Sequence, residues 1–463
     1  MGLASGPYGP KAVLRSTFPD VMIETQSLCD AARAVHANSS QTVVIVDGNV
    51  TIRSAHMEIN TLPQYVSFVQ TQLRQAFAAG NHVIVVFDDP KYLTRAKAEE
   101  QAKRDATRKK AKILTSDDLG TPINDHYILS SLLLNNPNLP VRNMIDQRPA
   151  RSRVMDAIVV EVFERFEREF AGALPGTPPR TLVMDGVDPR GGDRPIGMNR
   201  EAGFLVSVDT LKNVFDRTNP IGEGDLKITD VTDRIDQIHR IDGTAYKGVE
   251  VVLINTIDTD SLIIETIAHS RRSTSGQAGG LEPIYVLLCL KERAGTKRFL
   301  DGTQLDPSRG FYTCFDVQEL HDALIDHVSG SPPDRIPPLM RRKITSLIGM
   351  GAILTGCDFH TAFKGSRFCD ILEIITHICH EEPHALAGMD FAWRGDDVAL
   401  LRLSAQVVEL SRKSADIVND DPRRKKHVVE SLVRPLESDV LKVLWTLSYW
   451  HGKEKLNIED WGY

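Results

Sequence analysis

Five short apolar runs stand out along the chain, and polar residues follow most of them. Val, Ile and Leu dominate these runs without a regular polar alternation, which is typical of parallel strands covered on both faces. Helical periodicity predicts helices between the runs, at 62–80 and 155–174. Strands that alternate with helices predict an α/β fold with a mainly parallel central sheet flanked by helices. The runs are TVVIVD (42–47), HVIVVFD (82–88), TLVMD (181–185), VEVVLINTI (249–257) and PIYVLLCL (283–290).

The pattern changes after about residue 340, where no strand is predicted. Segments such as LMRRKITSLIGMGAIL and DILEIITHICH have the periodicity of helices. We therefore expect a helical C-terminal region at 341–463 and an α/β core at 1–340.

Composition narrows the class of protein. The chain has 463 residues, of which 41% are hydrophobic and 25% charged, as in ordinary globular proteins. No window is apolar for long enough to span a membrane, and the six cysteines indicate reduced thiols. We expect an intracellular protein with no membrane partner, either nuclear or cytoplasmic. The net charge of −7 means that phosphate contacts would need a local basic cluster.

Acidic residues gather where the predicted strands end. Ligands of open parallel sheets bind outside the carboxyl ends of the strands, so these acids form one candidate site. Without a metal such a cluster would repel itself, whereas two divalent ions about 4 Å apart would neutralise it and would suit phosphodiester hydrolysis. The acids are Asp47, Asp88, Asp89, Asp185, Asp258 and Asp260 after strands, Glu223 and Asp225 in NPIGEGDLKI, and Asp358 in GMGAILTGCDF.

Asp258 and Asp260 allow two interpretations. If the chain stays extended, side chains two positions apart point to one side, and the two carboxylates could bind a cation together. The alternative is an aspartate-rich turn, since Asp bonds its own backbone in turns. A single pair does not decide between them.

The order of these motifs resembles that of the flap endonuclease/XPG superfamily and of the related Xrn-type 5′→3′ exoribonucleases, which share a PIN-like core. VVIVDGN and VVFDDP are similar to the motifs of the first two metal aspartates, and KAEEQAKR is similar to the basic helix that follows them. PIGEGDLKI resembles an Xrn motif, IDTDSLI resembles the family's D-x-D, and LTGCDF its G-x-D-[YF]. The similarity covers roughly residues 40–365.

The resemblance implies a nuclease with two Mg²⁺ or Mn²⁺ ions, acting on DNA or RNA that has a 5′ end or flap. Asp47, Asp88, Glu223 and Asp225 would hold one ion, and Asp258, Asp260 and Asp358 would hold or orient the second. Lys97 and Arg104 would stabilise the phosphate charge. The residues expected to contact nucleic acid are Arg53, Lys91, Arg95, Lys97, Lys103, Arg104 and Arg108.

The chain also departs from the family pattern. Arg53 stands where relatives place an aromatic residue or histidine beside the 5′ nucleotide, although arginine can still stack on a base. The helix–turn–helix after Asp358 lacks its G-x-G, so we expect a degenerate element without potassium. Asp185 lies in TLVMDGVDPRGG, which resembles an Xrn motif but follows the wrong helix, and it stays outside the core set.

The segment 91–112, KYLTRAKAEEQAKRDATRKKAK, is dense in Lys and Arg. It is either a solvated helix with ion pairs along one face or part of an arch-like insertion around 90–150 that contacts phosphates. For the whole protein, the alternative to a nuclease is a degenerate PIN-like domain that serves as a scaffold or a nucleic-acid-binding assembly subunit.

Overall fold

The computed structural model describes residues 9–55, 58–88, 138, 140–145, 148–171, 180–185, 196–199, 204–205, 221–235, 249–275, 284–292, 311–355 and 367–381. The chain divides into two units. The sheet unit comprises Ile23–Ile257 and Val286–Cys314, and the helical unit comprises Met1–Met22, Asp258–Tyr285 and Phe315–Tyr463. The units are interleaved along the chain, whereas the sequence analysis places one boundary at 340.

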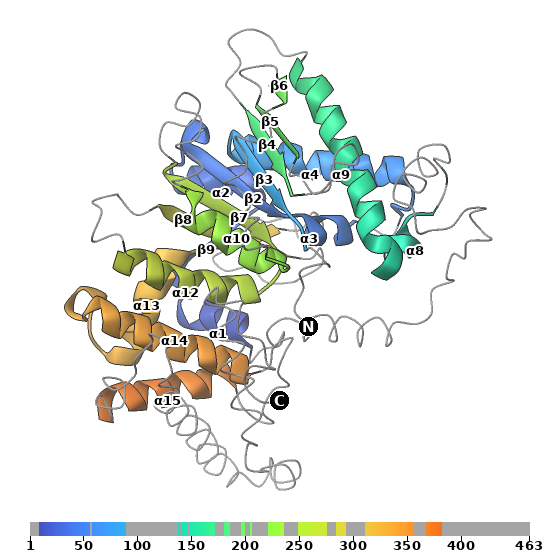
Figure 1. Cartoon of the computed structure of the whole chain (residues 1–463). Helices are drawn as coiled ribbons and strands as arrows, with labels where there is room; N and C mark the ends of the chain where they lie inside the picture. The colour runs from blue at the N-terminus through green and yellow to red at the C-terminus, as the bar shows by residue number, and fades with distance from the viewer. Residues whose placement is uncertain are drawn as a thin grey trace, which may run out of the picture. The chain divides into compact units, whose positions relative to one another are not determined.

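The described strands form one sheet in the order β1-β9-β8-β7-β2-β3-β4-β5-β6 (Figure 1). β2 pairs in parallel with both β3 and β7, and β3 pairs in parallel with β4. The carboxyl ends of β7, β2, β3 and β4 therefore lie at the same edge. β5 and β6 extend the sheet in antiparallel pairs. The strands are β1 (Met22–Thr25), β2 (Thr42–Asp47), β3 (His82–Val86), β4 (Thr181–Met184), β5 (Ile196–Asn199), β6 (Phe204–Leu205), β7 (Val251–Thr256), β8 (Tyr285–Glu292) and β9 (Phe311–Asp316).

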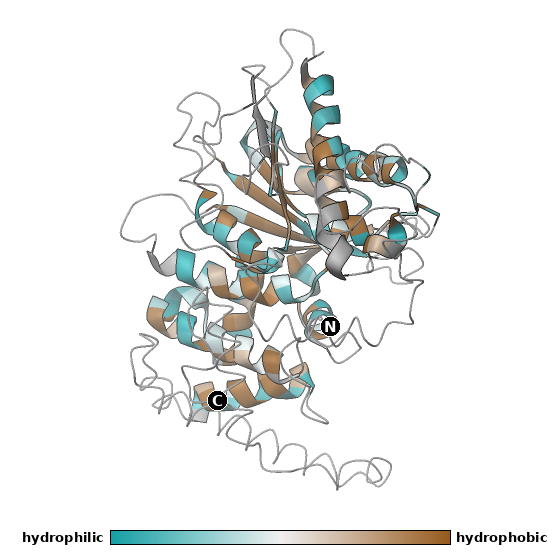
Figure 2. Ribbon diagram, turned by 45° about the vertical axis from the view of Figure 1, so that its right-hand side comes forward, coloured by the Kyte–Doolittle hydropathy of each residue, from teal (hydrophilic) through white to brown (hydrophobic). Residues whose placement is uncertain are grey.

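The core of the sheet unit lies around these central strands. Every residue of β2, β3, β4 and β7 is buried, and Figure 2 shows the strands as predominantly hydrophobic. Burying an aliphatic side chain of this size contributes about 1.5–3 kcal/mol, which explains why the runs contain so few polar residues.

Helix α4 (Leu62–Ala79) packs on β2 and β3. Its first turn is fixed by the Gln64 side chain, whose oxygen accepts hydrogen bonds from the backbone N–H groups of Asn60 and Thr61. Helix α9 (Arg148–Ala171) lies against α4 through the rings of Phe77, Phe166 and Phe170. The other α-helices described in this unit are α2 (Leu28–Ala34), α3 (Gly48–Arg53), α8 (Arg142–Ile145) and α10 (Gly224–Asp233), and η2 (Ser39–Gln41) is a 3-10 helix.

In the helical unit, α12 packs against α13 and α14, and α15 packs against α13 and α14. The N-cap of α13 is Asp316, which accepts a hydrogen bond from the Glu319 N–H, and the helix ends at Gly330 in the left-handed conformation with φ 63°. No helix among the described residues is long and apolar enough to cross a membrane. The helices are α1 (Pro10–Thr17), α12 (Asp260–Ser275), α13 (Val317–Ser329), α14 (Pro338–Leu354) and α15 (Phe368–Glu381), with 3-10 turns η1 (Pro19–Val21) and η5 (Pro333–Arg335).

The predicted α/β class is confirmed, with a sheet whose centre is parallel and which is flanked by helices. The five apolar runs form β2, β3, β4, β7 and β8, and the two predicted helices between them are α4 and α9. Strands β1, β5, β6 and β9 were not predicted. The PIN-like identity of the core stays a prediction.

Candidate active site

Asp47 is the last residue of β2, and its carboxylate is buried with only 6% of the residue exposed. Oδ1 accepts a hydrogen bond of 2.9 Å from the Val50 N–H, so Asp47 is also the N-cap of α3. Oδ2 accepts a bond of 3.3 Å from the Thr256 hydroxyl at the end of β7. The carboxylate is therefore held by two neighbouring elements and has a fixed orientation at the strand edge.

Gly48 allows the ring of Phe87 to lie close beside Asp47. A Cβ atom on Gly48 would stand 2.3 Å from Phe87 Cε1, well inside van der Waals contact. Phe87 is buried and directly precedes Asp88. The glycine of the D-G-N motif thus permits the end of β3 to approach the beginning of α3.

Asp88 follows β3 and fixes the start of helix α10. Its Oδ1 accepts a hydrogen bond of 2.8 Å from the Gly224 N–H. Gly224 lies between Glu223, the buried N-cap of α10, and Asp225 in its first turn. Carboxylates are stabilised near the positive end of a helix dipole. This one hydrogen bond brings two of the predicted acids to the strand edge that carries Asp47 and Asp88.

A lysine–aspartate pair completes this edge. The Lys227 ammonium donates to Asp185 Oδ2 at 2.6 Å and to the Phe87 carbonyl oxygen at 2.7 Å. Asp185 also accepts a bond of 3.3 Å from the Phe87 N–H. The pair is largely shielded from solvent, with 10% of the Lys227 side chain and 21% of the Asp185 side chain exposed.

Asp185 is not one of the seven predicted metal ligands, and no sequence motif singles out Lys227 by itself. The structure places both at the edge formed by β3, β4 and α10. The signal for Lys227 was its spacing, since a residue four positions after Glu223 lies on the same side of a helix.

Asp258 and Asp260 follow β7 in the chain and stand at the start of α12. The chain does not stay extended, because β7 ends at Thr256 and α12 begins at Asp260. The Asp260 N–H donates to Asp258 Oδ1 at 3.3 Å, as in an aspartate turn. The interpretation of Asp258 and Asp260 as an extended pair was therefore wrong, because the Asp258 carboxylate accepts a hydrogen bond from the backbone N–H of the first residue of the helix.

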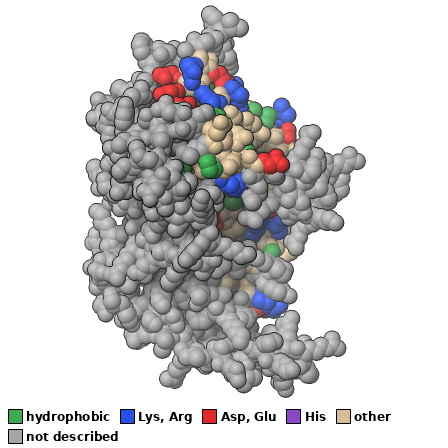
Figure 3. Space-filling view, turned by 90° about the vertical axis from the view of Figure 1, so that its right-hand side faces the viewer, with side chains coloured by type: hydrophobic (Ala, Val, Ile, Leu, Met, Phe, Trp, Pro, Cys, Tyr) green, Lys and Arg blue, Asp and Glu red, His purple; other side chains and the backbone are tan. Residues whose placement is uncertain are grey.

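Arg53 is exposed in the last turn of α3. Asp358, Asp89 and the basic residues of 91–112, namely Lys91, Arg95, Lys97, Lys103, Arg104 and Arg108, lie outside the described residues. On the face of the molecule in Figure 3, the described basic and acidic side chains are intermixed. That part of the surface does not present the single sign of charge that attracts nucleic acid by itself.

The donor chemistry of the edge fits a hard divalent cation, because Mg²⁺ and Mn²⁺ prefer carboxylate oxygens. Within the described ranges, however, no three His, Cys, Asp or Glu side chains converge in a group that could hold a metal ion. The described edge supplies Asp47, Asp88, Glu223 and Asp225, and the other predicted ligands belong to the helical unit or to residues that are not described.

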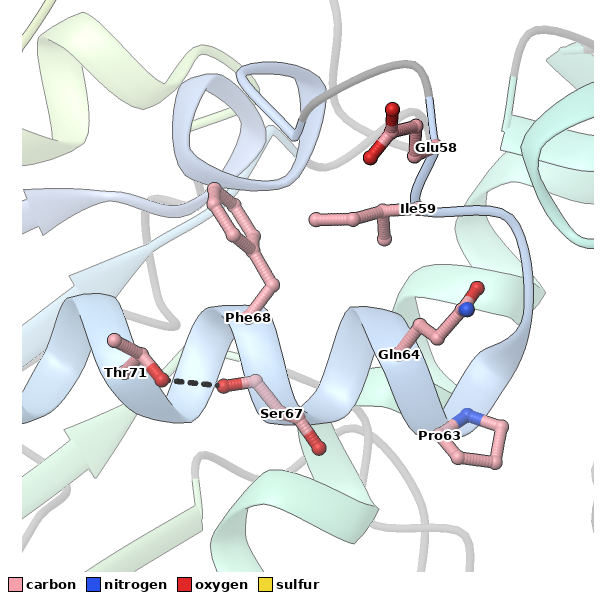
Figure 4. Close-up of a pocket in the computed structure, with 7 residues that line it drawn as sticks. All are labelled: Glu58, Ile59, Pro63, Gln64, Ser67, Phe68 and Thr71. Atoms are coloured by element: carbon pink, nitrogen blue, oxygen red, sulfur yellow. Dashed lines mark hydrogen bonds between the residues drawn. The ribbon is translucent and has the colours of Figure 1, made fainter. Parts of the chain in front are cut away.

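A separate groove of about 580 Å³ lies along α4 and the loop that precedes it (Figure 4). None of the seven predicted metal ligands lines it. Its wall carries the hydrogen bond from the Thr71 hydroxyl to the Ser67 carbonyl oxygen. The lining residues are Glu58, Ile59, Pro63, Gln64, Ser67, Phe68 and Thr71.

No known protein family and no curated protein matches this chain. The proposals below therefore depend on the geometry of the site and on the motifs of the sequence.

Proposed function

We propose that the protein is a divalent-metal-dependent 5′ nuclease that hydrolyses phosphodiester bonds in DNA or RNA. The observation that carries this proposal is the 2.8 Å hydrogen bond from the Gly224 N–H to Asp88 Oδ1. It joins the acidic first turn of α10 to the parallel strand edge where Asp47 lies. Acidic residues more than a hundred positions apart are thereby brought to one edge of the sheet, where they would serve as oxygen ligands.

Two ions, Mg²⁺ or Mn²⁺, would be held by the acids that the motifs identify. Asp47, Asp88, Glu223 and Asp225 would hold one, and the three acids Asp258, Asp260 and Asp358 would hold or orient the other. When bound, such ions lower the pKa of an attacking water and neutralise the charge that develops on the phosphate.

The chain's own groups hold the ligands in place. The Thr256 hydroxyl and the Val50 N–H fix the two oxygens of Asp47, and the Gly224 N–H fixes one oxygen of Asp88. Each carboxylate oxygen has a second lone pair, so an oxygen that accepts one of these hydrogen bonds can still coordinate a metal ion. Lys97 and Arg104, in the basic segment, would bind the phosphate and stabilise its charge.

The polarity of cleavage is proposed from the resemblance to 5′ nucleases, in which a basic segment follows the second metal aspartate. If the strand reaches the acids under that segment as in those nucleases, it needs a free 5′ end. We expect linear single strands and 5′ flaps to be cut much faster than closed circles of the same sequence. Comparing the two rates in Mn²⁺ tests this, and equal rates would leave a metal-dependent endonuclease without 5′ preference.

The alternative proposal is a scaffold that has lost catalysis, and one observation favours it. Lys227 already places a positive charge at the carboxylate edge, bonded to Asp185 and to the Phe87 carbonyl oxygen. A scaffold whose edge carboxylates are compensated by Lys227 binds no metal there, so its melting temperature should be the same with and without Mn²⁺. A nuclease with occupied sites should be stabilised by about 2.7 kcal/mol when the metal is at a hundred times its Kd.

A further inference from the structure

Four arginines lie on two packed helices of the helical unit. Arg271 and Arg272 are in the second half of α12, and Arg341 and Arg342 are in the first half of α14. The two helices pack against each other. All four side chains are half-buried, so their charges are less screened than those of fully exposed side chains.

The two acids identified beside these arginines are already engaged. Glu265, with 1% of its side chain exposed, forms an ion pair of 3.0 Å with Arg272. Asp322 on α13 lies 3.0 Å from Nδ1 of His321. The Glu265 carboxylate neutralises Arg272. Asp322 keeps its charge, but among the described residues neither acid forms an ion pair with Arg341 or Arg342. Arg271, Arg341 and Arg342 are called the arginine cluster from here on.

The members of the arginine cluster are close enough to influence neighbouring charges. Burial lowers the pKa of the Arg342 guanidinium, and the positive charge of Arg271 lowers it further. Burial is the main cause of the lowered pKa of His269, which lies on the same helix as Arg271, and the charge of Arg341 contributes to it. Cations from both helices are therefore held together against their mutual repulsion.

Two nitrogen atoms of the cluster also lack a hydrogen-bond partner. The Nε atoms of Arg341 and Arg342 are buried without one. In the part of the chain that the structure describes, no carboxylate forms an ion pair with either side chain. An unsatisfied buried donor costs about 1–3 kcal/mol. These Nε atoms are not accessible to a ligand, but an oxyanion at the accessible part of the two half-buried side chains would offset their repulsion. Guanidinium groups bind phosphate through paired N–H groups.

We propose that the arginine cluster of Arg271, Arg341 and Arg342 is a binding site for a backbone phosphate of a nucleic acid. This rests on the proposed function in naming nucleic acid as the source of the phosphate. The positive end of the α14 dipole supports an anion at the same place.

The position of the cluster on α12 fixes its distance from the proposed metal ligands. Asp260 begins this helix, and at about 1.5 Å per residue Arg271 lies about 16 Å further along the axis. One strand of B-form DNA has a phosphate every 3.4 Å or so along the axis. A backbone that runs along α12 with this rise would meet Arg271 about five nucleotides beyond Asp260.

The test measures binding without cleavage. Fluorescence anisotropy of a labelled single-stranded DNA in EDTA gives Kd over a range of salt concentrations for the wild type and for Arg341→Ala with Arg342→Ala. Each lost contact should reduce the slope of log Kd against log salt by about 0.7, so the double variant should lose about 1.4. The control is Arg33→Ala, an exposed arginine of α2 paired with Asp30, which should leave the slope unchanged.

Charge-preserving variants distinguish the loss of a phosphate contact from the effect of misfolding. Arg341→Lys with Arg342→Lys should keep most of the slope, because the two positive charges remain. A double alanine variant with the slope and Kd of the wild type would overturn the phosphate site. The phosphate site and the nuclease can be tested separately. If the site exists but the protein is not a nuclease, the double alanine variant will have a smaller salt slope than the wild type in EDTA, and the wild type will cut no substrate with Mn²⁺.

Discussion

The Lys227 ammonium lies 2.6 Å from Asp185 Oδ2, in a pair that is largely shielded from solvent. Because Lys227 also bonds the Phe87 carbonyl oxygen, one side chain of α10 joins the ends of β3 and β4. The orientation of the edge on which Asp88 lies therefore depends on an ion pair in which neither residue is a predicted metal ligand.

Lys227→Met should destabilise the sheet unit strongly. Removing one partner of a buried ion pair leaves the other charge uncompensated, which costs about 3 kcal/mol. Urea denaturation measures the loss. The single variant Asp185→Leu should also lower the free energy of unfolding. The double variant Lys227→Met with Asp185→Leu should lose less of this free energy than the two single variants together, since it leaves no unpaired charge. Additive losses would show that the two side chains do not interact in solution.

Gly48→Ala should destabilise the protein by about 2 kcal/mol, because the new methyl group overlaps the ring of Phe87. Thermal unfolding in EDTA measures this effect without any contribution from metal. Phe87→Leu with Gly48→Ala should recover part of the loss, since leucine leaves room beside the helix start. A Gly48→Ala variant as stable as the wild type would contradict the close approach of Phe87 to α3.

Stability should fall between neutral and mildly acidic pH because of His269. Burial, followed by the charge of His321, lowers the pKa of His269 from 6.5 to about 3. Below pH 6.5 the unfolded chain takes up a proton at this residue and the folded chain does not, so acid favours unfolding. The contribution is about 1.4 kcal/mol for each pH unit below 6.5, until the folded pKa is reached.

The measurement is the free energy of unfolding at several pH values for the wild type and for His269→Gln. The variant should lose this part of the pH dependence. His36→Gln, at an exposed histidine, is the matched control and should behave as the wild type. Parallel curves for the wild type and His269→Gln would mean that His269 titrates alike in the folded and unfolded chains.

Asp258→Asn and Asp260→Asn should each reduce cleavage by more than the roughly 10–100-fold that loss of an outer-shell partner of a metal ligand costs, because here a ligand itself is lost. In EDTA both variants should be at least as stable as the wild type, because the repulsion relieved between the neighbouring carboxylates exceeds the lost interaction with the start of α12. The amide that replaces the Asp258 carboxylate would keep an oxygen to accept the Asp260 N–H. Rates within tenfold of the wild type for both variants would remove these residues from the metal site.

The central strands were predictable because burial on both faces leaves a local signal. Val43, Val44 and Ile45 are apolar without interruption, since β2 lies between β7 and β3 and is fully buried. β5 and β6 contain only IGMN and FL. Segments that short have no period to recognise. β5 becomes a strand through its pairing with β4, and β6 through its pairing with β5.

The pairing of Lys227 with Asp185 could not be predicted, although both lie in motifs of the sequence. The contact needs β4 to lie beside β3 and α10 to begin beside Asp88, and both are long-range relationships that no local pattern encodes. The acids at strand ends were predictable for the opposite reason, because parallel pairing alone puts such residues at one edge.

The central claim is that the carboxylates of this edge support metal-dependent cleavage, and Asp88→Asn tests it most directly. Asparagine keeps the oxygen that accepts the hydrogen bond from the Gly224 N–H, so α10 should stay in place while a metal ligand loses its charge.

The measurement is the rate at which 5′-labelled single-stranded DNA, single-stranded RNA and 5′-flap DNA are cut in Mn²⁺ and in EDTA. Asp334→Asn, at an exposed residue of η5, is the control. We predict cleavage of at least one substrate by the wild type and the control, only with Mn²⁺. Asp88→Asn should lose more than the roughly 10–100-fold that removal of an outer-shell partner of a metal ligand costs. Equal rates for Asp88→Asn and the wild type, or no cleavage of any substrate by the wild type, would contradict the account.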